Sequence, residues 1–182
     1  SQNLRRPQHW NQAFWFETDD DIDSAALGGA LEHLVLRHEM LRAHVTWVNG
    51  EWQQRIQQTV ALPPIRQISL RGLAPSVQET QLQTIADELH ADMQLSPAPL
   101  MRCALVDLGA NRGHRLLIVI HHLAVDAVSW GIIAADLAHL YSQISQGQPA
   151  ESAPVRTSYA QWAKTLNSLA ADAAVRNDQA FW

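Results

Sequence analysis

Five apolar residues in a row followed by two histidines most strongly constrain what this chain can fold into. Residues 116–120 read Leu-Leu-Ile-Val-Ile, and three of the five are β-branched. Such a run predicts a strand that is buried on both faces. After His121 and His122, apolar residues recur at helical spacing, which predicts a helix over residues 127–146. The histidines therefore lie where a central strand gives way to a helix, the kind of junction where functional groups gather in α/β folds.

Alternation, helical periodicity and turn residues predict the other elements. Asn49-Gly50 favours a type I′ hairpin turn, because both central positions of that turn need a positive φ. The expected strands cover residues 10–17, 41–48, 51–56, 65–70, 100–107 and 113–120, and the expected helices cover residues 24–38, 76–93 and 127–146. This order predicts an α/β (α+β) fold, with a mixed sheet covered by helices.

The helix starts carry capping signals. Asp23 or Ser24 can cap the first helix, and Ser76 with Glu79 has the spacing of a capping box. A last helix is expected to begin at Thr157 or Ser158, again with capping-box spacing to a glutamine three residues on. It is expected to pack through its apolar side chains, which are Tyr159, Trp162, Leu166 and Leu169.

Composition narrows the function classes. The chain has 182 residues, enough for one domain with a sizeable core, and a formal net charge of −5, which argues against a nucleic-acid partner. No stretch reaches the roughly 18 apolar residues of a membrane span. The single cysteine, Cys103, cannot form an internal disulfide and reads as a small core residue. With no signal peptide at the start, the expected location is cytoplasmic.

The histidine pair suits proton transfer, because an imidazole exchanges a proton readily near neutral pH. Asp126, four positions after His122, could bind an imidazole, pair with an arginine or cap the following helix. A buried histidine is more often a satisfied core residue than a catalyst. No second cluster of ligand residues supports a metal site, and no GxSxG turn supports a nucleophilic serine.

The segment His121 to Ala127 resembles the HHxxxDG signature of condensation-type domains in nonribosomal peptide synthetases. Three further segments match the same family in order and spacing. Residues 37–42 are similar to its RHExLR segment, residues 95–102 to its LxxxPLxR strand entry, and residues 157–163 to its TSxxxWA helix. The chain departs from the pattern at Ala127, where the family has glycine. In such domains the motif borders a substrate tunnel. A methyl group at residue 127 would narrow this tunnel or shift the loop that carries the motif.

Within the family, the resemblance favours the epimerization branch. Val128-Ser129-Trp130 resembles the end of its DGVSW motif, and residues 9–12 resemble its opening HxNQ. The resemblance implies a chloramphenicol-acetyltransferase-like fold of two lobes with a tunnel between them. Residues 1–182 would be the N-terminal lobe, with the C-terminal lobe outside this chain.

The implied reaction is removal and return of the Cα proton of an aminoacyl or peptidyl thioester. The substrate would arrive on the 4′-phosphopantetheine arm of a peptidyl carrier protein, with no metal or organic cofactor required. The resemblance groups His121 and His122 as the catalytic residues. It makes His122 one of two acid/base groups, while a glutamate of the absent lobe would be the other. The remaining roles that it implies are support of the loop for His121, pairing of Asp126 with Arg42, and lining of the substrate channel for Ala127, Ser129 and Trp130.

Two other readings stay open. A condensation domain would join two carrier-bound substrates through a peptide bond, and a non-catalytic lobe would only dock a carrier protein or a neighbouring synthetase domain. We expect the chain alone to be inactive. We also expect it to expose an apolar face where the second lobe belongs, so that it can dimerise.

Overall fold

The computed structural model describes residues 7–18, 21–59, 61–62, 64–152, 154–170 and 175. The chain divides into two units, residues 1–152 and 153–182, which are described separately. The first unit contains η1 Pro7–His9, β1 Asn11–Thr18, α1 Ser24–Arg37, η2 Glu39–Arg42, β2 Ala43–Val48, β3 Glu51–Ile56, β4 Arg66–Ser69, α2 Pro75–Ala91, β5 Met101–Asp107, β6 His114–His121 and α3 Ala127–Ser145. The second contains α4 Tyr159–Ala170.

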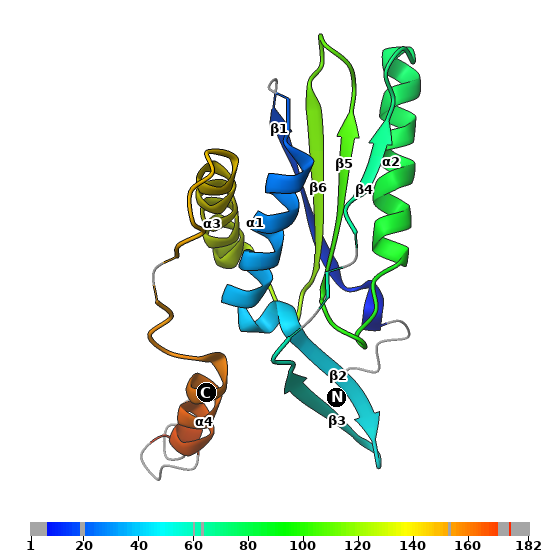
Figure 1. Ribbon diagram of the computed structural model, residues 1–182. Coiled ribbons are helices and arrows are strands. Elements are labelled where there is room, and N and C mark those ends of the chain that lie inside the picture. The colour runs from blue at the N-terminus through cyan, green and yellow to red at the C-terminus, as the bar shows by residue number, and fades with distance from the viewer. Residues whose placement is uncertain are drawn as a thin grey trace. The chain divides into compact units, whose positions relative to one another are not determined.

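The core of the first unit is a four-stranded mixed sheet in the order β1-β6-β5-β4. β6 pairs antiparallel with both β1 and β5, whereas β4 runs parallel to β5 at the edge. Helix α2 covers one face of the sheet, and α1 and α3 cover the other (Figure 1). The predicted fold class, a mixed sheet covered by helices, is confirmed.

Strand β6 contributes to both hydrophobic cores. Ile118 and Ile120 belong to the cluster that includes α1 and α3, whereas Leu117 and Val119 belong to the cluster that includes α2. All four side chains are fully buried. The unbroken apolar run therefore marks the innermost strand, as the sequence predicts.

The hairpin forms as predicted. β2 pairs antiparallel with β3, and Trp47 lies opposite Trp52. Asn49 and Gly50 adopt φ values of 52° and 86°, the left-handed pair that a type I′ turn requires. The two indole rings pack edge to face with 5.0 Å between their centroids.

The helix caps agree with the sequence in part. Asp23 caps α1, since its carboxylate accepts from the backbone N–H groups of residues 25 and 26. The capping box predicted for α2 is wrong, because the N-cap is Ala74 and no side chain caps this helix. Pro75 holds the first helical position, where its missing N–H leaves no donor unsatisfied. Glu79 binds Arg112 instead.

The capping box of α4 is confirmed. The Ser158 Oγ accepts from the Gln161 N–H at 3.1 Å, and the Gln161 Oε1 accepts from the Ser158 N–H at 3.0 Å. How this helix packs remains a prediction. Its apolar side chains, Tyr159, Trp162, Leu166 and Leu169, are 39% to 51% exposed.

An ion-pair cluster joins α1 to α3. The Asp136 carboxylate lies 2.7 Å from Arg37 Nε and 2.8 Å from His38 Nε2. Burial alone would raise the pKa of the Asp136 carboxyl, but the hydrogen bonds from Arg37 and His38 outweigh burial and hold this pKa below its usual value. The first two residues of the RHExLR-like segment therefore tie the two helices that cover one face of the sheet.

Replacing Asp136 by asparagine is expected to lower the free energy of unfolding by about 2 kcal/mol, because the amide cannot balance two cationic partners. The lowered pKa makes the contribution fully present above the usual aspartate pKa, and it is lost as the pH falls through the lower folded value. Urea unfolding at pH 7 and at acid pH measures both effects. In the control, Asp92→Asn, the mutated side chain is 71% exposed and pairs with Arg102 at the surface, so the expected loss is below about 1 kcal/mol. Equal losses for the two variants would contradict the prediction.

Candidate functional site

The site lies where β6 ends, and backbone hydrogen bonds to both neighbouring strand regions fix its two histidines. The His121 N–H donates to the carbonyl of Leu100, just before β5, at 3.0 Å. The His122 N–H donates to the carbonyl of Trp10, just before β1, at 2.8 Å. Each histidine is therefore anchored on a different side of the central strand, and their positions are set by the sheet.

His121 points into the interior. Only 1% of its surface is exposed, and its Nδ1 accepts from the Leu123 N–H at 3.1 Å. A side chain sealed in this way cannot meet a substrate, so the grouping of His121 with the catalytic residues is wrong. Its contact with Leu123 fits the other role expected of it, holding the turn that follows β6.

His122 is half-buried, and its ring is held at both nitrogens. Its Nδ1 lies 2.7 Å from the Val125 carbonyl oxygen. Because a carbonyl only accepts, Nδ1 carries the proton, and the neutral ring has its lone pair on Nε2. The Trp10 ring packs edge to face against the imidazole, with 4.7 Å between centroids. One basic nitrogen, Nε2, is thus left on the side of the ring away from the loop.

Gln12 of β1 and Trp130 of α3 complete this arrangement. The Trp130 Nε1–H donates to Gln12 Oε1 at 2.8 Å, and Gln12 Nε2 lies 3.2 Å from His122 Nε2. Trp130 is only 4% exposed and packs against Phe14, with 4.7 Å between ring centroids. Its place in the wall of a substrate channel remains a prediction. The sequence flagged Gln12 and Trp130 in two separate motifs, but nothing in either motif indicated that the two side chains touch.

Asp126 caps α3, which was one of its three possible roles. Its carboxylate accepts from the Ser129 backbone N–H at 2.8 Å and from the Ser129 hydroxyl at 2.6 Å. These two hydrogen bonds lower the pKa of the Asp126 carboxyl. Ser129 therefore serves the cap and is partly exposed, while Ala127 is exposed at the first position of the helix. Their place in a substrate channel remains a prediction.

Arg42 does not pair with Asp126, and that prediction is wrong. The Arg42 guanidinium donates to the carbonyls of Val35 at 3.0 Å and Leu36 at 3.1 Å, near the end of α1. It also donates to the carbonyls of Gln57 and Gln58, just after β3. Backbone carbonyls at a helix C-terminus attract a cation, so Arg42 joins α1 to the hairpin instead of reaching the site.

In the described part of the chain, no group of three or more His, Cys, Asp or Glu side chains could hold a metal ion. Among the same residues, no helix has both the length and the apolar character needed to cross a bilayer.

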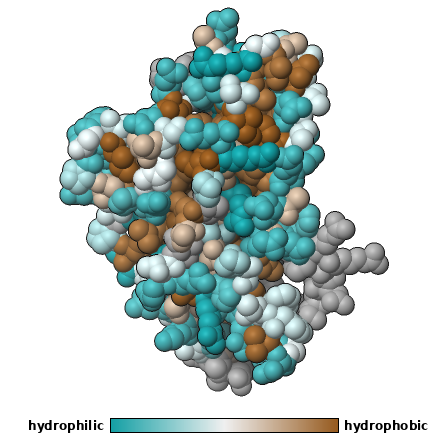
Figure 2. Space-filling view, turned by 45° about the vertical axis from the view of Figure 1, so that its right-hand side comes forward, coloured by the Kyte–Doolittle hydropathy of each residue, from teal (hydrophilic) through white to brown (hydrophobic). Residues whose placement is uncertain are grey.

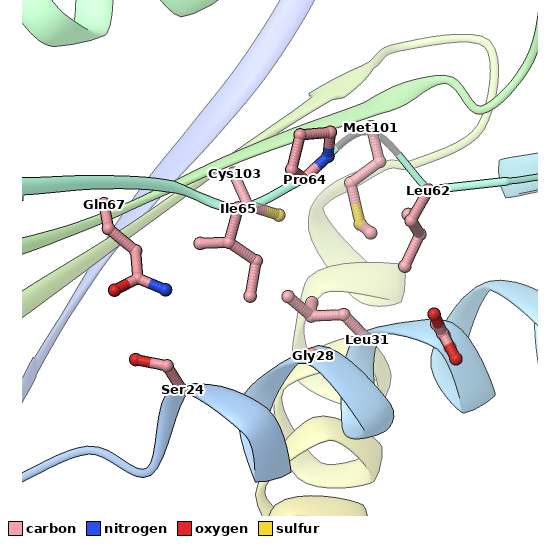
Figure 3. Close-up of a pocket in the computed structure, with 10 residues that line it drawn as sticks. Ser24, Gly28, Leu31, Leu62, Pro64, Ile65, Gln67, Met101 and Cys103 are labelled. Carbon is pink, nitrogen blue, oxygen red and sulfur yellow. The ribbon is translucent and has the colours of Figure 1, made fainter.

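A cavity of about 240 Å³ lies between α1 and the β4 edge of the sheet (Figure 3). Ser24 and Leu31 of α1 face Ile65, Gln67 and Cys103 across it. Burial raises the pKa of the Cys103 thiol to about 12, so this group stays protonated and unreactive at neutral pH. Neither His122 nor any of its hydrogen-bond partners lines this cavity, which is therefore separate from the histidine site.

Curated proteins similar to this chain are large peptide synthases. The chain is 34% identical over 176 residues to one of the subunits of linear gramicidin synthase from Brevibacillus parabrevis, a match that covers 97% of this chain and 3% of the relative. It is 33% identical over 164 residues to chondramide synthase cmdD of Chondromyces crocatus, covering 90% of this chain and 4% of that protein. The chain thus spans only a small fraction of these relatives.

Solved structures share the fold. The epimerization domain from the third module of tyrocidine synthetase B superposes with a TM-score of 0.89 at 29% identity, covering 99% of this chain and 40% of that one. The first condensation domain of the calcium-dependent antibiotic synthetase gives a TM-score of 0.82 at 24% identity, covering 100% and 43%. The family model described as Condensation domain matches residues 1–182 in full. With its mixed sheet and the histidine pair at the end of the central strand, this chain belongs to the condensation domain superfamily of nonribosomal peptide synthetases.

Proposed function

We propose that this chain is the N-terminal lobe of an epimerization domain, which inverts the Cα centre of an aminoacyl or peptidyl thioester on a peptidyl carrier protein. The observation that carries the proposal is the similarity over 99% of the chain to a tyrocidine synthetase epimerization domain, at a TM-score of 0.89. The geometry of His122 adds a chemical reason. With Nδ1 bound to the Val125 carbonyl, the neutral form of the ring would present its lone pair on Nε2, in a half-buried position at the end of a strand.

The reaction follows from the acidity of a Cα–H bond beside a thioester carbonyl. His122 Nε2 takes the proton from one face, and the electron pair of the broken C–H bond moves onto the carbonyl oxygen as an enolate. A second group on the opposite face returns a proton to Cα, and the centre is inverted. That group belongs to the C-terminal lobe, so the proposal assigns this chain one of two acid/base groups.

Exposed apolar side chains around the histidine site support the need for a second lobe. Trp10 and Leu123 flank His122, Phe14 continues along β1, and Val128 and Ile132 follow in the first turns of α3; all five are at least 40% exposed. Figure 2 shows apolar patches between hydrophilic residues on one face of the molecule. Single exposed apolar residues are common, but a cluster beside a functional site indicates a surface that is covered in the complete protein.

A condensation domain is the second candidate, favoured by the matching family model and by the fold shared with the calcium-dependent antibiotic synthetase domain. The same Nε2 could take a proton from an attacking amine as a peptide bond forms. The epimerization proposal ranks above it because identity and TM-score are both higher for the epimerization domain, at 29% against 24% and 0.89 against 0.82.

Product analysis of the full-length synthetase separates the two candidates. The carrier protein would be loaded with an L-aminoacyl or peptidyl thioester, incubated, and the thioester hydrolysed for chiral chromatography. We expect a mixture of D and L products. A new amide between two carrier-bound substrates would establish condensation instead. Unchanged L substrate would show that the chain has no catalytic role and only docks a partner.

A further inference from the structure

We propose that Gln12 is a positioning residue that fixes the tautomer of the His122 ring, and that Trp130 in turn fixes Gln12. The kinetic consequence rests on the proposed role of His122 as a base. The structural claim does not, because it concerns which ring nitrogen carries the proton. We call this chain of contacts, from Trp130 through Gln12 to His122, the relay. Its indole comes from α3, its amide from β1 and its imidazole from the turn after β6.

The direction of the relay follows from Trp130. An indole N–H only donates, so the Gln12 atom 2.8 Å from it must be the carbonyl oxygen. The Gln12 NH₂ group then faces the imidazole, and its nitrogen is 3.2 Å from His122 Nε2. An amide NH₂ donates, so Nε2 must accept. Because Trp130 is buried, its indole N–H cannot turn to water and keeps donating to Gln12. The buried indole therefore fixes the orientation of the Gln12 amide.

The contact at the other end of the ring favours the same tautomer. The Val125 carbonyl, 2.7 Å from Nδ1, needs a proton on that nitrogen. The nearby Asp126 carboxylate has its own hydrogen bonds to Ser129. The tautomer of the His122 ring is therefore determined by its contacts with Val125 and Gln12. Two contacts on opposite nitrogens thus agree on a proton at Nδ1 and a lone pair at Nε2.

The register of the sheet explains why Gln12 can do this. Gln12 lies opposite Ile120, so it is beside the end of β6 and on the face that carries Phe14 and α3. The backbone N–H of Trp130 donates to the Asp126 carbonyl at 3.2 Å, so this residue lies in the first turn of α3. At 3.2 Å the Gln12 contact is at the long end of the hydrogen-bond range, so a substrate can displace the amide from Nε2 after Gln12 has oriented the ring.

Nitrogen NMR of the histidine-labelled 182-residue chain tests the structural claim, because protonated and unprotonated ring nitrogens resonate far apart. We expect His122 Nε2 at the unprotonated position and Nδ1 at the protonated one. In Gln12→Glu, the same shape offers only acceptors, so Nε2 is expected to move to the protonated position. Trp130→Phe keeps the ring packing but frees the amide, and the two nitrogens are expected to shift towards each other. The matched controls, Gln53→Leu and Trp15→Phe, are expected to leave the His122 signals unchanged.

Turnover in the full-length synthetase tests the consequence. Gln12→Leu and Trp130→Phe are each expected to lower kcat by about 10²-fold with KM little changed, the scale of a misplaced catalytic group. Because both act through one contact chain, the double variant should be no slower than the worse single variant. A wild-type Nε2 that carries the proton, or a Gln12→Glu ring that keeps the wild-type pattern, overturns the inference whether or not the enzyme epimerises. If the NMR pattern holds but the wild-type synthetase yields no D product, the proposed function fails and the relay stands.

Discussion

Replacing His122 by alanine in the full-length synthetase is expected to lower the rate of epimerisation by about 10³-fold, within the range that a positioned general acid/base contributes. The variant removes the Nε2 lone pair but leaves the backbone hydrogen bond from residue 122 to the Trp10 carbonyl intact. The strand end should therefore keep its position. The D to L ratio of the hydrolysed thioester over time measures the loss.

A matched histidine separates this effect from general damage. His33 is exposed on α1, and its Nδ1 lies 2.9 Å from the Gly29 carbonyl oxygen of its own helix. His33→Ala is expected to epimerise at the wild-type rate. If His122→Ala also keeps the wild-type rate, the chain has no acid/base role and serves only to dock a partner.

Replacing Gln78 by leucine is expected to cost about 3 kcal/mol of unfolding free energy, the largest stability effect among the variants considered. Gln78 is only 2% exposed, and its amide donates to the carbonyls of Leu70 at 2.9 Å and Leu108 at 3.0 Å. Its oxygen accepts from Arg112 Nη1 at 2.6 Å. Leucine has a similar size but leaves two carbonyls and a guanidinium without these contacts, and each loss costs about 1–3 kcal/mol.

Urea unfolding measures this cost. Gln81→Leu, on the exposed side of the same helix, changes the same atoms without touching a buried partner, so a change within about 0.5 kcal/mol is expected. A loss for Gln78→Leu no larger than for Gln81→Leu would show that the two carbonyls find water when the amide is removed.

The sequence predicted the features that depend on neighbouring residues. The apolar run of residues 116–120 became the innermost strand, Asn49-Gly50 formed the predicted turn, and Ser158 with Gln161 formed a capping box. Each of these depends on periodicity or on local hydrogen bonds, which a short segment contains in full.

The features that it missed depend on residues far apart in the chain. Arg42 does not reach Asp126, because its guanidinium bridges the end of α1 to the backbone carbonyls of Gln57 and Gln58, just after β3. The contact between Gln12 and Trp130 spans 118 positions and exists only because β1 pairs with β6 while α3 packs on the same face. No spacing rule connects such residues, so the environment of His122 emerged only from the fold.

Exchange of the Cα proton with solvent tests the central claim most directly. The full-length synthetase with a loaded carrier protein would be incubated in D₂O, and mass spectrometry of the released amino acid or peptide would count deuterium at Cα. We predict one deuterium at the inverted centre with wild-type enzyme and almost none with His122→Ala. Equal incorporation with and without the His122 imidazole would contradict the account.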